Sequence, residues 1–168
     1  MASSLKSLSD HDPALIPDGS SMKIGIAVSE WNEEITSALL EGALNTLQKH
    51  GVSRDKILVR AVPGSFELPY GARIVAEQFN PHVVICIGCI IQGETPHFDY
   101  ICQGVSRGIT ELNLDYDIPF IFGVLTTSNL QQAKDRSGGR HGNKGVEAAV
   151  TALKMASLRM NPKITVGT

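Results

Sequence analysis

The chain has 168 residues, of which 42% are hydrophobic and 19% charged, and its formal net charge is −2. This length and composition are typical of one soluble globular domain with its own core. The near-balanced charge argues against a general attraction to nucleic acid or to an anionic membrane, so an anionic ligand requires a local site.

The first 21 residues differ from the rest of the chain. They have no sustained hydrophobic period, and Pro13, Pro17 and Gly19 interrupt them. We expect an N-terminal arm over residues 1–21 that is either flexible or docked on a neighbouring subunit through the apolar segment 14–16. The N-terminus lacks a signal-peptide pattern, and no apolar run approaches the ~20 residues of a membrane span. We therefore expect a cytoplasmic protein without membrane contact.

From Met22 on, strand and helix patterns alternate. A buried strand is expected over residues 23–28, and Asn32 is placed to cap the helix that follows. The apolar positions of this helix recur every four residues, as an amphipathic helix requires. They are Ile35, Leu39, Ala43 and Leu47. Gly51 ends the helix.

The later elements follow the same alternation. Further strands are expected over residues 56–62, 83–91 and 119–125, with a helix after each of the first two. A short helix over 130–135 and a last helix after a Gly-rich loop complete the domain. Strands that alternate with helices predict an α/β domain over residues 22–160, in which a parallel sheet carries helices on both faces. Residues 161–168 are expected to form a tail.

Cys86 and Cys89 form a C-x-x-C pair inside the apolar run 83–90. A redox pair of this kind requires a helix start, where the dipole lowers the pKa of a thiol. Residues three apart on a strand point to opposite faces of the sheet. We therefore interpret both thiols as small buried hydrophobic groups, and three cysteines are too few for a disulfide framework.

Each junction between a strand and the next helix falls at one edge of a parallel sheet, where ligands bind. The most informative junction is the segment 93–100, GETPHFDY. Its backbone N–H groups near Gly93 can receive an anion, and His97 can transfer protons near neutral pH. A loop histidine can equally be a solvated or structural residue, and the residues alone leave both interpretations open.

Aromatic and polar residues at the other junctions also allow two interpretations. Trp31, the single tryptophan, is either a core residue at the rim of the sheet or a ring that stacks on a flat heterocycle. Residues 65–67 either cap the next helix or contact the polar edges of such a ring. Phe66 and Phe122 can close the same cavity, although Phe122 lies within a strand and such residues are usually core.

The segment 135–145 contains three cations and four glycines within eleven residues. Its glycines allow backbone amides to approach an anion, and Arg136 can hold a phosphate with two donors. It is not a nucleotide P-loop, because the second glycine and the Ser/Thr of that motif are missing and no strand precedes it. A GxGxxG fingerprint is also absent, so nucleotide hydrolysis and dinucleotide redox chemistry are disfavoured.

Five blocks in this order carry a resemblance to a known family: residues 31–36 (WNEEIT), 62–69 (VPGSFELP), 88–100, 122–127 (FGVLTT) and 142–145 (GNKG). Over most of residues 22–160 the chain resembles the 6,7-dimethyl-8-ribityllumazine synthases. The resemblance implies a flavodoxin-like three-layer α/β/α sandwich whose four-stranded parallel sheet has the strand order 2-1-3-4.

The activity implied by this resemblance is a transferase reaction without a cofactor or metal, the penultimate step of riboflavin biosynthesis. It condenses 5-amino-6-(D-ribitylamino)uracil with 3,4-dihydroxy-2-butanone 4-phosphate and releases phosphate and water. Two alternatives remain. One is a weakly active paralogue that serves as a flavin- or lumazine-binding shell protein, and the other is an unrelated flavodoxin-like binding module.

The resemblance also implies residue roles, with His97 as the proton-transfer residue. The residues expected to hold the pyrimidine are Trp31, Ser65, Phe66, Glu67, Cys89, Ile90, Ile91 and Phe122. Those expected at the phosphorylated ketone are Glu94, Thr95, Arg136 and Lys144. Gln92 departs from the family, in which many members carry a basic residue at this position.

Assembly is a further implication of the resemblance. The family builds each site between adjacent subunits, with Phe122 and Arg136 contributed by the neighbour. Its members form homopentamers, and some pack twelve of these into an icosahedral shell of 60 subunits. The loop 137–145 lacks the insertion of the pentamer-only members, which favours the shell. Riboflavin synthase is an additional partner that the resemblance suggests.

Overall fold

Four parallel strands form the central sheet in the computed structural model, which describes residues 12–161. They are β1 (Ile24–Ser29), β2 (Ile57–Val62), β3 (Val83–Ile91) and β4 (Phe120–Thr127). Their order across the sheet is β2-β1-β3-β4, and every neighbouring pair is parallel. The predicted strands and the strand order 2-1-3-4 are confirmed, with ends that differ by one or two residues.

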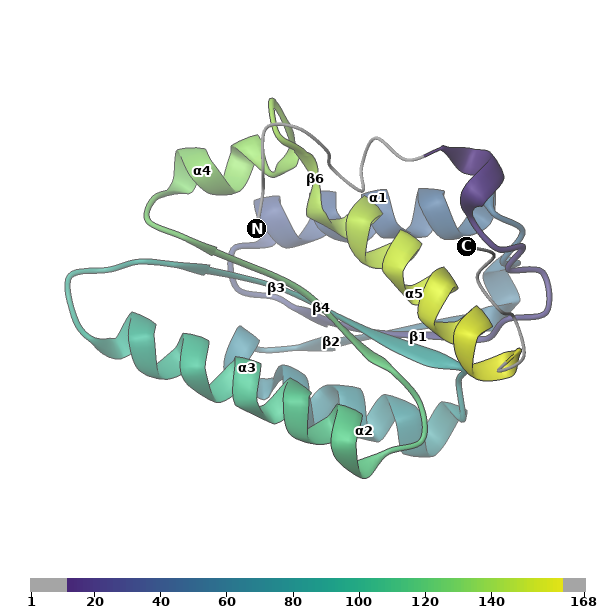
Figure 1. The fold of residues 1–168 in the computed structure, drawn as a ribbon. Coiled ribbons are helices and arrows are strands. Elements are labelled where there is room, and N and C mark those ends of the chain that lie inside the picture. The colour runs from purple at the N-terminus through teal and green to yellow at the C-terminus, as the bar shows by residue number, and fades with distance from the viewer. Residues whose placement is uncertain (1–11, 162–168) are drawn as a thin grey trace, which may run out of the picture.

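Five helices cover the two faces of this sheet. The first face carries α1 (Glu33–Lys49), α4 (Leu130–Asp135) and α5 (Lys144–Met160). The opposite face carries α2 (Leu68–Phe79) and α3 (His97–Asp115), and Figure 1 shows the sheet lying between the two groups. The fold is therefore the predicted three-layer α/β/α sandwich of the flavodoxin-like class.

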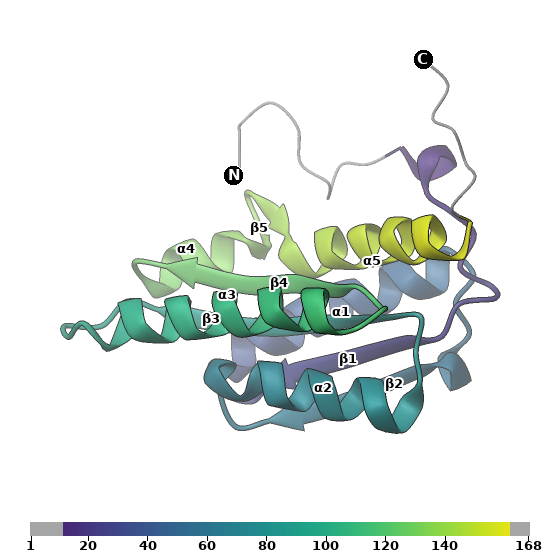
Figure 2. The same cartoon turned by 60° about the horizontal axis from the view of Figure 1, so that its bottom comes forward.

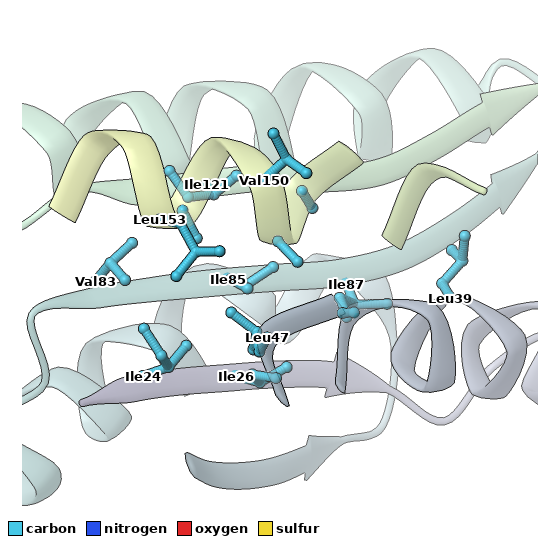
Figure 3. Close-up of a cluster of buried hydrophobic side chains, with 14 of the residues drawn as sticks. Ile24, Ile26, Leu39, Leu47, Val83, Ile85, Ile87, Ile121, Val150 and Leu153 are labelled. Carbon is cyan, nitrogen blue, oxygen red and sulfur yellow. The ribbon is translucent and has the colours of Figure 1, made fainter. Parts of the chain in front are cut away.

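Each face of the sheet has its own hydrophobic core. Figure 3 shows the first core, in which Ile85 and Ile87 of β3 meet Leu47 of α1 and Leu153 of α5. The alternate residues of β3, including Val84, pack with α2 and α3 on the other face. A strand that is buried on both faces must be apolar along its whole length. This requirement explains the uninterrupted apolar run of β3, and each fully buried Ile or Leu contributes about 1.5–3 kcal/mol.

Asn32 does not cap α1 in the predicted way. It occupies the position before the helix, but its side chain accepts no hydrogen bond from the helix start, and its backbone is left-handed (φ 62°, ψ 45°). The side-chain amide instead donates to the carbonyl oxygen of Cys89 at 2.9 Å. The capping prediction is therefore wrong, because a tertiary partner on β3 takes the side chain away from the helix.

The Gly-rich loop before α5 contains a small hairpin that the sequence pattern does not predict. Its strands, β5 (Ser137–Gly139) and β6 (Gly142–Asn143), are too short to show a period and pair antiparallel. Gly138 (φ 123°) and Gly142 (φ 78°) adopt backbone angles that favour glycine. Asn143 then caps α5, because its side-chain oxygen accepts from the N–H of Gly145 at 2.8 Å.

Residues 12–21 of the expected N-terminal arm contact the domain of their own chain. A short 3₁₀-helix, Pro13–Leu15, precedes Ile16, which is buried in the first core. The N–H of Gly19 donates to the carbonyl oxygen of His50 at 2.7 Å. Residues 1–11 of the arm and 162–168 of the tail lie outside the described part of the chain, so those predictions stay untested.

Candidate active site

The carboxyl ends of β1, β2 and β3 surround one cavity of about 650 Å³. The loop from β3 to α3 forms one side of it, and Figures 1 and 2 show this loop extending beyond the sheet edge. The residues that line the cavity are Trp31, Asn32, Gly64, Ser65, Phe66, Glu67, Cys89, Ile90, Ile91, Gly93, Thr95, His97, Phe98 and Ile101. Three of the four predicted junctions therefore meet at one place, as the parallel topology requires.

Two aromatic rings at the cavity are exposed to solvent. Trp31 is 73% exposed and Phe66 is 57% exposed, although both belong to residue types that are usually buried. This exposure rules out the interpretation of Trp31 as a core residue. Two exposed rings beside a cavity can enclose a flat heterocycle by stacking.

The segment 65–67 does not cap the helix that follows it. It forms a 3₁₀-turn, Ser65–Glu67, and no side chain accepts a hydrogen bond at the start of either this turn or α2. The capping interpretation is therefore wrong. All three residues line the cavity instead.

Two buried hydroxyl groups lie close to Gly88, and one of them, that of Ser65, belongs to a residue that lines the cavity. A Cβ atom on Gly88 would lie 2.7 Å from the Ser65 hydroxyl oxygen and 3.4 Å from that of Ser29. Neither hydroxyl has a hydrogen-bond partner among residues 12–161, although Ser65 is only 7% exposed and Ser29 only 1%. An unpaired buried hydroxyl costs about 1–3 kcal/mol. The sequence places Ser29 at the first strand–helix junction but gives it no role, because a serine at a strand end carries no further signal by itself.

The two thiols of the C-x-x-C pair lie on opposite faces of the sheet. Cys86 packs with α2 and α3, and Cys89 packs with α1 and α5. Burial raises the pKa of Cys86 to about 12 and that of Cys89 to about 11. Both are therefore neutral thiols at neutral pH, which supports their interpretation as hydrophobic residues. Cys89, Ile90 and Ile91 contribute the β3 side of the cavity.

His97 is the first residue of α3 and its side chain reaches the cavity. The ring forms no hydrogen bond or ion pair with another residue of the described range 12–161. An imidazole without a structural partner is available to exchange a proton with a ligand. Thr95 lines the same cavity, whereas Glu94 is exposed on the loop and is not part of the cavity wall.

The other expected residues lie elsewhere on the same chain. Phe122 and Lys144 line a second depression of about 260 Å³ against β4 and α5. Arg136, which follows α4, lines neither cavity. A single chain therefore separates Phe122, Arg136 and Lys144 from His97.

The three cations of the Gly-rich loop differ in their partners. The Arg140 guanidinium lies 2.9 Å from Asp135, and the Lys144 ammonium lies 3.0 Å from Glu147. A hydrogen bond from Gln131, and then the charge of Arg140, hold the pKa of Asp135 below its usual value. Arg136 forms no ion pair within the part of the chain that the structure describes. Of the three, Arg136 is thus the one whose charge is available to an anion.

Residues 12–161 contain neither a cluster of metal-ligating side chains nor a membrane-spanning helix. No group of three His, Cys, Asp or Glu side chains in this range is placed to hold a metal ion. No helix in the described range combines the length and apolarity that crossing a bilayer requires.

Comparison with known proteins gives one consistent result. Residues 21–160 match the family model described as 6,7-dimethyl-8-ribityllumazine synthase. A protein of that name from Parabacteroides distasonis is 60% identical over 157 residues, which cover 94% of this chain and 98% of the relative. Another from Porphyromonas gingivalis is 58% identical over 158 residues, with the same coverage. A third from Cytophaga hutchinsonii is 57% identical and covers 92% and 97%.

Proposed function

The chain belongs to the 6,7-dimethyl-8-ribityllumazine synthase family, and we propose that the cavity at the ends of β1, β2 and β3 is the pyrimidine half of its active site. The enzyme is a transferase of riboflavin biosynthesis. It condenses 5-amino-6-(D-ribitylamino)uracil with 3,4-dihydroxy-2-butanone 4-phosphate and releases phosphate and water. No observation favours the alternative of a weakly active shell protein.

The reaction needs orientation and proton transfer more than a strong electrophile. The amine of the pyrimidine forms an imine with the ketone, phosphate leaves, and the second ring closes with loss of water. Two substrates held in contact gain rate from proximity alone. Imine formation, phosphate release and ring closure all move protons near neutral pH, a task suited to an imidazole.

The observation that carries the assignment is the combination of two exposed rings and an unpaired imidazole at one cavity. In this proposal Trp31 stacks on the pyrimidine, and His97 transfers the protons. Phe66 closes the cavity beside the ring. The pyrimidine and ribityl groups are held by Ser65 and Glu67 and by the β3 segment 89–91. Glu94 and Thr95 contact the ketone from the β3–α3 loop.

The phosphate half of the site comes from a neighbouring subunit in our proposal. Arg136 supports this view, because its charge is unpaired within residues 12–161 and it lies apart from the cavity of its own chain. Phe122 and Lys144 accompany it from the same neighbour. The assembly that we propose is a cytoplasmic homopentamer, with twelve pentamers in an icosahedral shell because the loop 137–145 is short. Riboflavin synthase is the proposed partner protein.

A complementation assay tests the shared site. His97→Ala and Arg136→Ala are each expected to be poorly active at a concentration of the ketone phosphate below its wild-type KM, and product formation is followed by lumazine absorbance. If the two residues act across a subunit boundary, co-assembly of equal amounts regains about one quarter of the wild-type sites, since neighbours pair at random in a ring. A mixture that stays as inactive as its components after unfolding and joint refolding would exclude the shared site.

Sedimentation of the wild type as a pentamer alone would exclude the shell.

A further inference from the structure

Asn32 has an unusual backbone at the edge of the cavity. It is one of two non-glycine residues with positive φ among residues 12–161, the other being Asn80. Asparagine tolerates this left-handed conformation better than most residues, but the conformation persists only where the surroundings impose it. Asn32 also lines the cavity directly beside Trp31.

Three hydrogen bonds connect the segment 30–32 to the ends of two strands, β2 and β3. The N–H of Glu30 donates to the Val62 carbonyl oxygen at 2.8 Å, and the N–H of Trp31 donates to that of Pro63 at 3.1 Å. On the other side, the Asn32 amide donates to the Cys89 carbonyl oxygen at 2.9 Å. The segment thus bridges the end of β2 to the end of β3, with the Asn32 side chain as the bond on the β3 side.

The backbone of Asn32 also begins the next helix. Its carbonyl oxygen accepts the N–H of Ile35 at 2.9 Å and that of Thr36 at 3.1 Å. The left-handed turn at Asn32 is therefore the point where the chain leaves β1 and enters α1. A change in the backbone angles of Asn32 would therefore change the direction in which the side chain of the preceding residue, Trp31, points.

The orientation of the Trp31 side chain depends on this turn, because few contacts with its own chain hold the ring in place. The ring is 73% exposed and makes no ring or cation contact with another residue of the described part of the chain. Its direction therefore follows from the backbone on each side of it. The Pro63 bond holds Trp31 itself, and the Cys89 bond holds the residue after it.

We propose that Asn32 is a positioning residue for Trp31. Its left-handed backbone and its bond to Cys89 hold the indole over the cavity, where it is ready to stack on the pyrimidine. This inference rests on the stacking role of Trp31 in the proposed function. It assigns Asn32 no contact with the reacting atoms, so its loss affects binding of the pyrimidine more than turnover.

Two substitutions separate the backbone from the side-chain bond. Asn32→Gly keeps the left-handed turn without strain but removes the amide donor. Asn32→Asp keeps the size of the side chain and tolerates the turn, but its carboxylate cannot donate to the Cys89 carbonyl. Asn80→Gly is the matched control, because Asn80 has the same backbone conformation at the far end of α2 and does not line the cavity.

Trp31 provides a direct readout, since it is the only tryptophan of the chain. We expect lower fluorescence anisotropy and stronger acrylamide quenching of Trp31 in both Asn32 variants, measured on the intact assembly without substrate. The KM for the pyrimidine should rise about 5-fold, as expected for the loss of one net hydrogen bond. The KM for the ketone phosphate and kcat should stay near wild type, and Asn80→Gly should change none of these.

The outcomes distinguish this inference from the function it rests on. Wild-type anisotropy and quenching in both Asn32 variants would overturn the positioning role. A mobile Trp31 with an unchanged pyrimidine KM would support the positioning role and refute the stacking role of Trp31. If Asn80→Gly also lowered the anisotropy of Trp31 and increased its quenching, the effect would not be specific to Asn32. That result would overturn the inference.

Discussion

Gly145 lies where the start of α5 meets α1, and its replacement by alanine is the sharpest test of this packing. A Cβ atom at Gly145 would lie 1.8 Å from the carbonyl oxygen of Leu39 and 2.6 Å from its carbonyl carbon. Both atoms belong to the backbone of α1, so no side chain can turn aside. Helix propensity alone predicts the opposite result, because alanine is favoured over glycine within a helix by up to ~1 kcal/mol.

The size of the effect follows from the movement that the new atom requires. An ordinary van der Waals contact begins at 3.4 Å, so α5 must move 1.6 Å away from the 1.8 Å position. The same movement breaks the 3.0 Å hydrogen bond from the Asn143 amide to the Ala38 carbonyl oxygen. Overpacking of up to ~3 kcal/mol and a lost bond of ~1 kcal/mol outweigh the gain in propensity, leaving a net destabilisation of about 3 kcal/mol. For a chain of this size the midpoint of thermal unfolding falls by roughly 9 °C.

Thermal and urea unfolding of Gly145→Ala and wild type measure this difference. Both proteins must be compared at one concentration, because assembly makes the midpoint concentration-dependent. Gly93→Ala is the matched control, since no atom beyond its two chain neighbours lies within 4 Å of its added Cβ, and its stability should stay within about 0.5 kcal/mol of wild type. A Gly145→Ala protein as stable as wild type, or more so, would refute the close approach of α5 to α1.

Three further predictions concern two residues of the candidate site and the two buried thiols of β3. His97→Ala should lower kcat by about 10-fold or more without a change in thermal stability, and an unchanged kcat would remove His97 from the mechanism. Arg136→Ala should raise the KM for the phosphate substrate, and a rise confined to the KM of the pyrimidine would contradict its assignment. Because burial raises the pKa of Cys86 to about 12 and that of Cys89 to about 11, both remain protonated near neutral pH. They should therefore react with a disulfide reagent only after unfolding. The half-buried Cys102 is replaced by serine for this test, and rapid reaction of the native Cys102→Ser protein would argue against the burial of the other two thiols.

Much of the fold was predictable because the hydrophobic pattern is strong. The run 83–91 is apolar throughout, as a strand covered on both faces must be. The four-residue period of α1 places Leu39 and Leu47 in the core. The parallel topology then brings the strand ends together, so the cavity follows from the element order. The hairpin β5–β6 did not follow, since strands of three and two residues show no period.

The types of residue in the candidate site were predictable, but the exposure and the hydrogen-bond partners of each side chain were not. The sequence placed His97, Trp31 and residues 65–67 at strand ends, yet it left open whether each was structural. The exposure of Trp31 and the unpaired ring of His97 depend on which side chains surround them. Asn32 shows the same limit, since the sequence pattern predicts a cap and Cys89 of β3 provides the actual partner.

By itself, the amino-acid sequence determined the family, the order of strands and helices, and the edge of the sheet at which the candidate site lies. These follow from periodicity and from local motifs, which are properties of neighbouring residues. Only the tertiary structure decided which cation of the Gly-rich loop is unpaired, and that an alanine at Gly145 should destabilise a helix whose propensity it improves. The physical reason is that charge pairing and steric contact depend on groups that are distant in the chain and become neighbours only when it folds.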